Sequence, residues 1–245
     1  MSEVIVSCEH IKKTFVMGKE EVHALVDISV DINKAEYVSI MGPSGSGKST
    51  LFNMIGGLDT PTAGKVEVDG YSLADLSSSQ LSWFRCHKIG FIFQSFNLIG
   101  TMTAVENVAI ARIFSGVSPE QARIDAAKVL ERVGLGHRLD HLPSEVSGGQ
   151  QQRIAIARSL VNEPLIILAD EPTGNLDLKT GEDIIALLNE MKNDLKVTII
   201  TATHDMKMLS CSDKIIHIDQ GNIKAIDTSD DVKVKIGSID GDMVM

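Results

Sequence analysis

The sequence predicts an α/β fold, because short apolar stretches typical of strands alternate with segments of helical pattern. Five stretches are nearly all apolar, as strands covered on both faces should be: residues 38–41, 89–93, 165–169, 197–200 and 215–218. The first 40 residues instead alternate apolar and polar side chains in the manner of β-strands. The 245 residues are enough to bury a core, as one large domain or as two small ones.

Two helix starts stand out between these strands. Thr103 and Glu106 have the spacing of a capping box, in which each side chain bonds the other residue's backbone N–H. Residues 118–121 have the same spacing, and Pro119 suits the first helical position. We expect this second helix to stop at Gly134, because glycine favours the backbone conformation that ends a helix.

Composition and charge exclude several classes of protein. The chain has 23 Lys and Arg against 33 Asp and Glu, and a net charge of −10 is unsuited to a phosphate backbone, so no nucleic-acid partner is expected. No apolar run approaches the roughly 20 residues that cross a bilayer, and the N-terminus lacks the order of a signal peptide, so we expect no direct membrane insertion. The three cysteines fit neither a disulfide framework nor a zinc site, and they suit a reducing cytoplasm.

A glycine-rich loop follows the expected strand at residues 38–41. Residues 42–49 read GPSGSGKS, which matches the phosphate-loop pattern G-x-x-x-x-G-K-[ST], and a helix-like run comes next. The glycines let backbone N–H groups close around phosphate oxygens, and the helix N-terminus adds positive potential. We expect Lys48 to reach the β- and γ-phosphates of a nucleotide and Ser49 to bind Mg²⁺. The expected phosphate-binding residues are Gly42, Ser44, Gly45, Ser46, Gly47, Lys48, Ser49 and Thr50.

Two carboxylates end the apolar stretch at residues 165–169. Asp170 at the strand end suits a Mg²⁺ ligand, and Glu171 could orient or deprotonate an attacking water. The alternative is a plain acidic turn before Pro172, which the phosphate loop makes the weaker interpretation. The pair favours an ATPase over a small-molecule kinase, which would need an acceptor site instead.

Further motifs carry a family resemblance. Residues 146–153 read VSGGQQQR, residues 175–177 read NLD, and residues 203–205 read THD after an expected strand. Gln94 follows the strand at residues 89–93, and Phe15 lies near the N-terminus, before the phosphate loop. With these motifs in this order, the chain resembles the nucleotide-binding domain of ABC transporters over about residues 4 to 226.

The resemblance implies a fold and a domain division. The fold would be α/β, a P-loop NTPase core with an N-terminal antiparallel β subdomain and a helical insertion specific to ABC proteins. Residues 1–226 would form a single nucleotide-binding domain with its helical subdomain at about 95–160, and residues 227–245 would form an acidic C-terminal tail. Ala35 departs from the family pattern, in which glycine is usual.

The resemblance also implies roles for single residues, in a head-to-tail dimer with two ATP molecules between the subunits. Besides the phosphate loop, the ATP-binding residues would be Phe15, Gln94, Ser147, Gly148, Gly149, Gln150 and Asp177. The catalytic residues would be Glu171 and His204, and the Mg²⁺ ligands would be Ser49, Gln94 and Asp170. Ser147 also fits the N-cap of a helix, and Phe15, which replaces a usual tyrosine, could instead belong to the core or a turn.

Three further stretches narrow the resemblance: residues 57–64, 93–98 and 103–108 look like the Lol-type and MacB-type ATPases of lipoprotein release and macrolide export. ATP with Mg²⁺ would be used by a homodimer that drives integral-membrane permease subunits. The chain would be cytoplasmic and peripheral on the inner face of the cell membrane. Phe96, Leu98 and Met102 would contact the permease or belong to the core. Two alternatives remain, an FtsE-type regulatory ATPase and, disfavoured by the charge, a nucleic-acid-associated ABC ATPase.

Overall fold

The computed structural model describes residues 3–18, 20–203, 209 and 211–228. The chain divides into two compact units: unit 1 combines Met1–Ala74 with Ile200–Met245, and unit 2 is Asp75–Ile199. Both units contain strands and helices, which confirms the predicted α/β class. Among the described residues, no helix is long and apolar enough to cross a membrane.

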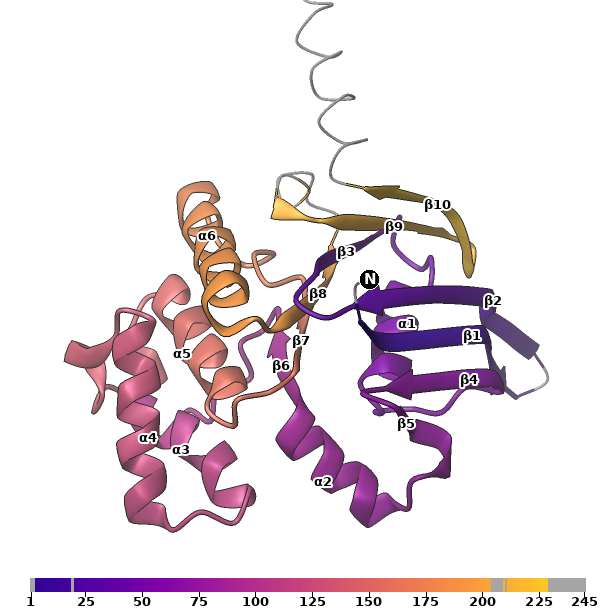
Figure 1. Ribbon diagram of the computed structural model, residues 1–245. Helices are drawn as coiled ribbons and strands as arrows, with labels where there is room; N and C mark the ends of the chain where they lie inside the picture. The colour runs from indigo at the N-terminus through magenta and orange to yellow at the C-terminus, as the bar shows by residue number, and fades with distance from the viewer. Residues whose placement is uncertain (1–2, 19, 204–208, 210, 229–245) are drawn as a thin grey trace, which may run out of the picture. The chain divides into compact units, whose positions relative to one another are not determined.

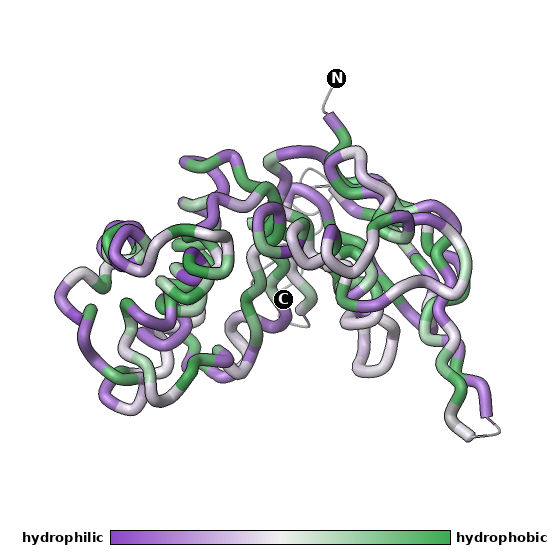
Figure 2. The backbone as a smooth tube through the Cα atoms, turned by 90° about the horizontal axis from the view of Figure 1, so that it is seen from below, coloured by the Kyte–Doolittle hydropathy of each residue, from purple (hydrophilic) through white to green (hydrophobic). Residues whose placement is uncertain are grey.

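The N-terminal part of unit 1 is an antiparallel sheet, as the resemblance implied. It contains β1 (Val4–Met17), β2 (Glu20–Asn33), β4 (Ala63–Val68) and β5 (Tyr71–Ser72), in the order β5-β4-β1-β2. Every neighbouring pair in that order is antiparallel. Hydrophobic and hydrophilic segments alternate along the β1–β2 hairpin, in keeping with a sheet that has one covered face (Figure 2).

Three more strands complete the described sheet of unit 1: β3 (Tyr37–Met41), β9 (Lys214–Asp219) and β10 (Asn222–Thr228). Parallel pairing joins β3 to β9, antiparallel pairing joins β9 to β10, and all five residues of β3 are buried. The strand β10 was not predicted, and it extends two residues into the segment expected as a tail. Residues 229–245 lie outside the described residues.

Two local features connect these strands to the sequence. Ala35, in the turn between β2 and β3, has φ of 58°, a left-handed conformation that glycine adopts at lower cost, which explains why glycine is usual there. The helix α1 (Lys48–Ile55) follows β3 and packs against β2 and β4 (Figure 1). Its buried face is Leu51, Phe52, Met54 and Ile55.

Unit 2 contains the parallel strands β6 (Ile89–Phe93) and β7 (Ile166–Asp170), close to the predicted ranges. The helices α2 (Ser78–Lys88) and α5 (Gly148–Leu160) pack against β6, and α6 (Leu178–Leu195) packs against α5. The remaining predicted strand is β8 (Thr198–Thr203), where the chain passes from unit 2 to unit 1. Short 3₁₀ turns occur at Leu73–Asp75, Gly136–Arg138 and Pro143–Glu145.

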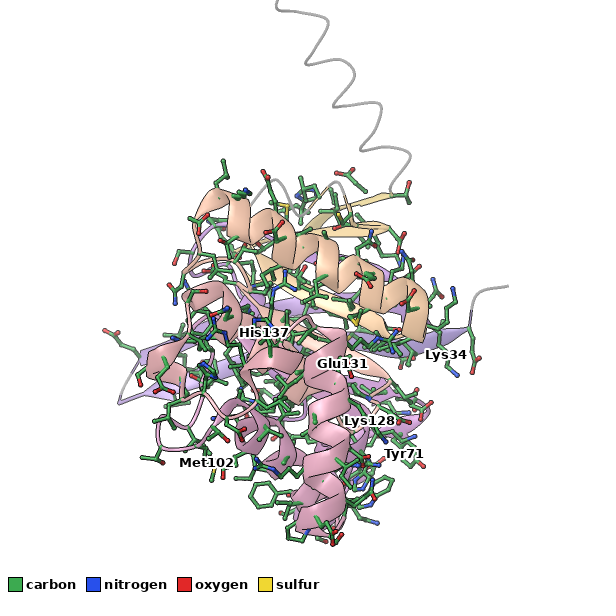
Figure 3. All side chains as sticks on the ribbon, turned by 90° about the vertical axis from the view of Figure 1, so that its left-hand side faces the viewer. Lys34, Tyr71, Met102, Lys128, Glu131 and His137 are labelled. Atoms are coloured by element: carbon green, nitrogen blue, oxygen red, sulfur yellow. The ribbon has the colours of Figure 1, made fainter. Side chains whose placement is uncertain are left out.

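The helices α3 (Ala104–Phe114) and α4 (Pro119–Arg132) pack together and onto α5 (Figure 1). The buried residues of α4 recur every four positions (Ala122, Ala126 and Leu130), and its exposed face carries Lys128 and Glu131 (Figure 3).

The capping box at Thr103 and Glu106 is confirmed. The capping box expected at residues 118–121 is only half formed. Ser118 Oγ accepts from the N–H of Gln121, but the Gln121 side chain donates to Asp125 Oδ1 at 2.9 Å instead of returning to the cap. The Asp125 carboxylate, four residues on, binds the Gln121 amide and so holds that side chain away from the cap, and the prediction of a reciprocal box was wrong here.

Candidate functional site

The glycine-rich loop lies between β3 and α1 in unit 1, as predicted. Gly47 is the N-cap residue of α1, and no side-chain hydrogen bond caps the first turn, which also lacks an acidic residue. The N–H groups of that turn are therefore available to an anion beyond the helix end, which is the usual setting for bound phosphate.

Gly47 cannot be replaced without strain. Its φ of 107° is a conformation that side chains disfavour. An added Cβ would also lie 2.6 Å from the carbonyl oxygen of Ala24 and 3.0 Å from Leu25 Cδ2, both on β2. The loop is thus pressed against β2, and only glycine lets the backbone pass at this distance.

Lys48 turns its side chain back onto the loop. Its residue is 9% exposed, and its Nζ donates to the carbonyl oxygens of Gly42 at 2.8 Å and Pro43 at 2.9 Å. The neighbouring Ser46 is 3% exposed, and its Oγ has no hydrogen-bond partner among the described residues. A fixed ammonium, an unpaired buried hydroxyl and an uncapped helix end together fit a polyphosphate.

The other predicted residues of the loop differ in exposure. Ser44, Gly45 and Ser49 are exposed, and Thr50 is half-buried. The exposed hydroxyl of Ser49 on the first turn of α1 suits a hard cation such as Mg²⁺. Among the residues that the structure describes, no group of three or more His, Cys, Asp or Glu could hold a metal ion by itself.

Phe15 lies on β1 of the same unit and is 39% exposed. It is therefore a surface residue and not part of the core, which was the alternative interpretation. Its register partner is Val22, and the same hairpin strand places Ala24 and Leu25 against Gly47. The aromatic ring and the phosphate loop therefore share the β2 strand as a common support.

Asp170 ends β7 in unit 2, directly opposite Phe93 of β6, so Gln94 follows the neighbouring strand end. Glu171 comes next with φ of 44°, an uncommon left-handed conformation for a residue with a side chain. Its carbonyl oxygen accepts from the N–H of Gly174 at 3.0 Å. Glu171 therefore lies in a tight turn directly after the strand end that carries Asp170.

Gln152 of α5 was not predicted, and it supports this turn. Its side chain is fully buried, and its Nε2 donates to the carbonyl oxygen of Pro172 at 2.8 Å. The helix that begins at the SGG motif is thereby bonded to the residue after Glu171. A buried glutamine inside a polar run gives no sequence signal that distinguishes it from its exposed neighbours.

Gln94 and Asn175 are also joined. Asn175 Nδ2 donates to the Gln94 carbonyl oxygen at 2.9 Å, and Gln94 Nε2 lies 3.5 Å from Asn175 Oδ1. The segment after Gln94 is held by Arg158 of α5, which donates to the carbonyl oxygens of Phe96 at 2.8 Å and Asn97 at 2.6 Å. Burial lowers the pKa of that guanidinium.

Three residues were expected to contact a permease or to belong to the core: Phe96, Leu98 and Met102. Each is half-buried, with Met102 in the loop before α3 (Figure 3). Neither interpretation is tested by their exposure alone.

Asp177 caps α6 in the single chain. Its Oδ2 accepts from Thr180 Oγ1 at 2.6 Å, and its Oδ1 accepts from the Thr180 N–H at 3.1 Å. These two bonds lower the pKa of the Asp177 carboxyl, the hydroxyl contributing most. The carboxylate is exposed.

Ser147 is the N-cap residue of α5, as its sequence suggested. Ser147 Oγ accepts from the Gln150 N–H at 3.3 Å, and Gln150 Oε1 accepts from the Ser147 N–H at 3.0 Å. The box leaves the N–H groups of Gly148 and Gly149 at the open end of the helix.

The two glycines of this motif differ in their surroundings, which predicts a difference in stability. A Cβ at Gly148 would meet Leu176 at 3.5 Å and Phe96 at 3.8 Å, which are ordinary contacts. A Cβ at Gly149 would overlap Thr180 Cγ2, whose side chain is fixed by Asp177. Gly149→Ala should therefore destabilise the fold by about 1–3 kcal/mol relative to the matched Gly148→Ala.

Thermal unfolding checks this prediction. A difference of that size corresponds to about 2–12 °C between the two melting temperatures for a chain of this length. Equal melting temperatures for Gly149→Ala and Gly148→Ala would contradict the prediction, because they would show that the Thr180 side chain moves aside at little cost.

Most predicted site residues therefore fall into two groups. Unit 1 holds the phosphate loop and Phe15, and unit 2 holds Gln94, the carboxylates, Asp177 and the residues at 147–150. His204 lies outside the described residues.

Comparison with known sequences and structures adds independent findings. The pattern of the family described as ABC transporter matches residues 25–174. The ABC transporter ATP-binding protein MJ0796 of Methanocaldococcus jannaschii is 45% identical over 224 residues, covering 90% of this chain and 95% of that protein. Its dimeric structure in a post-hydrolysis state with ADP and phosphate has a TM-score of 0.85 at 43% identity, covering 92% of this chain and 99% of that one.

Two further relatives carry functional names. The lipoprotein-releasing system ATP-binding protein LolD of a Shewanella species is 41% identical over 226 residues, covering 92% of this chain and 98% of that protein. The macrolide export ATP-binding/permease protein MacB of Syntrophobacter fumaroxidans is 44% identical over 222 residues, covering 90% of this chain but 31% of that longer protein.

Proposed function

The chain belongs to the ABC transporter family, and we propose that it is the ATP-hydrolysing subunit that drives a separate membrane permease. The observation that carries the proposal is the phosphate loop, where Lys48 lies over the carbonyl oxygens of the loop beside the uncapped N-terminus of α1. ATP places three linked phosphates on such a site, and the charge that the loop compensates increases as the terminal phosphate leaves.

The roles of single residues follow from this proposal. Lys48, Ser46 and the loop N–H groups bind the phosphates, and Phe15 stacks on adenine. Ser49, Gln94 and Asp170 hold Mg²⁺, which when bound neutralises part of the phosphate charge. Glu171 positions or deprotonates the attacking water, and His204 contacts the γ-phosphate and keeps Glu171 in register.

The active unit is a head-to-tail homodimer. The γ-phosphate needs hydrogen-bond donors on more than one side, and the open N–H groups of Gly148 and Gly149 supply them from the partner. MJ0796 has been solved as a dimer with ADP and phosphate, which supports this arrangement. Asp177 links the two sites across the interface, and hydrolysis loosens the dimer by removing the anionic bridge.

The cargo class is lipoprotein release or export, supported by the names of LolD and MacB. The permease reads the cargo, and this chain supplies the mechanical step at the cytoplasmic face of the membrane. The half-buried Phe96, Leu98 and Met102 are the proposed contacts for the permease. No feature of the described residues favours the regulatory alternative, in which nucleotide state would signal without moving cargo.

The Gly148→Asp variant tests the role proposed for Gly148 at the N-terminus of α5. We expect ATP binding by the monomer to stay near normal, since the monomer has room for a Cβ at Gly148. Hydrolysis should be lost, because the carboxylate would meet the partner's γ-phosphate with a like charge. Nucleotide titration and phosphate release separate the two effects. If the monomeric variant no longer bound ATP, the proposal that Gly148 acts on the partner's ATP would be wrong.

A further inference from the structure

Lys13 lies beneath the exposed ring of Phe15 on β1. The Lys13 side chain is only 12% exposed, whereas Phe15 is 39% exposed. The Lys13 ammonium lies 5.0 Å from the centroid of the Phe15 ring, within the range of a cation–π contact. The ammonium therefore lies over one face of a ring that is still partly exposed to solvent.

Two oxygens hold the ammonium in place. Lys13 Nζ donates to Asp59 Oδ1 at 2.7 Å and to the carbonyl oxygen of Thr60 at 2.8 Å. A lysine ammonium has three N–H groups, so these two bonds leave its remaining positive edge for the ring. The long side chain is thus fixed at its charged end, which an exposed lysine is not.

The same lysine is connected to the phosphate loop through the backbone. Lys13 pairs in register with Leu25, the β2 residue that packs against Gly47. Asp59 lies just beyond the C-terminus of α1, and its N–H donates to the carbonyl oxygen of Asn53 in that helix. Lys13, and with it the Phe15 ring, is therefore connected to both ends of α1: through Leu25 to its N-terminus and through Asp59 to its C-terminus.

We propose that Lys13 is a positioning residue for nucleotide binding: anchored by Asp59 and Thr60, it fixes Phe15 as a platform for the adenine base at a set distance from the phosphate loop. The proposal rests on the proposed function, in which the loop binds ATP. A phenylalanine has no hydroxyl to hold its ring through a hydrogen bond, so the cation beneath it sets the orientation. A fixed ring loses less freedom when a base stacks on it.

The experiment compares ATP with inorganic triphosphate, which has the phosphates but no base. Affinities are measured by calorimetry with Mg²⁺ for the full chain, its Lys13→Met variant and the matched control Lys12→Met, which changes an exposed lysine on the same strand. Lys13→Met should weaken ATP binding about three- to tenfold and leave triphosphate binding unchanged, because only stacking is disturbed. Lys12→Met should change neither.

Three additional variants test whether Lys13 acts through the ring. Lys13→Arg keeps the charge and should retain ATP affinity. In a Phe15→Leu chain, Lys13→Met should cause no further loss, because the platform is already absent. Asp59→Asn leaves Lys13 in place with a weaker anchor, and it should show a smaller loss of the same kind.

The outcomes separate this inference from the proposed function. An equal loss of ATP and triphosphate affinity in Lys13→Met would overturn it, because the lysine would then support the loop and not the base. A further loss in the Phe15→Leu chain would overturn it as well. If the unchanged protein bound neither ligand, or if Lys48→Ala had no effect on either, the proposed function itself would be wrong.

Discussion

Lys48→Ala is expected to abolish ATP hydrolysis and to weaken nucleotide binding while the fold stays intact. The lysine is the charged group of the phosphate loop, and its ammonium bonds only the carbonyl oxygens of Gly42 and Pro43 in the described structure. Its removal takes away the positive charge that opposes the β- and γ-phosphates, in a site where screening by water is low. A fluorescent ATP analogue measures binding, and phosphate release measures turnover.

Lys128→Ala is the matched control, since it removes one positive charge from the exposed face of α4, outside the proposed site (Figure 3). Both variants should melt within a few degrees of the unchanged protein, because neither opens a cavity in the core. Unchanged affinity and turnover in Lys48→Ala would refute the assignment of the loop. A collapse of the fold would instead show that the Lys48 bonds to the loop are structural.

Glu171→Gln should reduce hydrolysis about 10²- to 10⁴-fold while ATP binding survives. The amide keeps the volume of the carboxylate and can still form a hydrogen bond, but it loses the basic oxygen and one negative charge. The phosphate loop and Asp170 are untouched. The loss of a negative charge near the γ-phosphate should also favour dimer closure, so the variant should accumulate with ATP bound.

The control for this variant is Glu131→Gln on the exposed face of α4, which makes the same chemical change away from the site. It should hydrolyse ATP at the rate of the unchanged protein. Hydrolysis by Glu171→Gln near that rate would remove Glu171 from the catalytic role, and another group would have to activate the water.

The sequence predicted those parts of the fold that have two covered faces. The strands β3, β6 and β7 are continuous apolar runs, because no residue in them reaches solvent freely. The strands β4 and β10 were missed, because many of their residues are exposed or polar. Their pairing depends on partners that are distant in the sequence, which a local pattern does not contain.

The site divides in the same way. The phosphate loop and the cap at Ser147 are local structures, and short motifs encode them completely. The roles of Lys13 and Gln152 could not be predicted. Lys13 is anchored by Asp59 and Gln152 bonds Pro172, and only the folded chain brings these distant partners near. The box expected at residues 118–121 formed only in part because the sequence rule ignores other partners for the Gln121 side chain, and Asp125 is one.

We expect ATP to join the phosphate loop of one subunit to residues 147–149 of another. Size-exclusion chromatography with saturating ATP or ADP is the most direct test. It compares the Glu171→Gln variant with a double variant that carries both Glu171→Gln and Gly148→Asp. The account predicts a dimer with ATP and a monomer with ADP for the single variant, and a monomer with ATP still bound for the double variant. A single variant that stays monomeric with ATP, or a double variant that dimerises equally well, would contradict it.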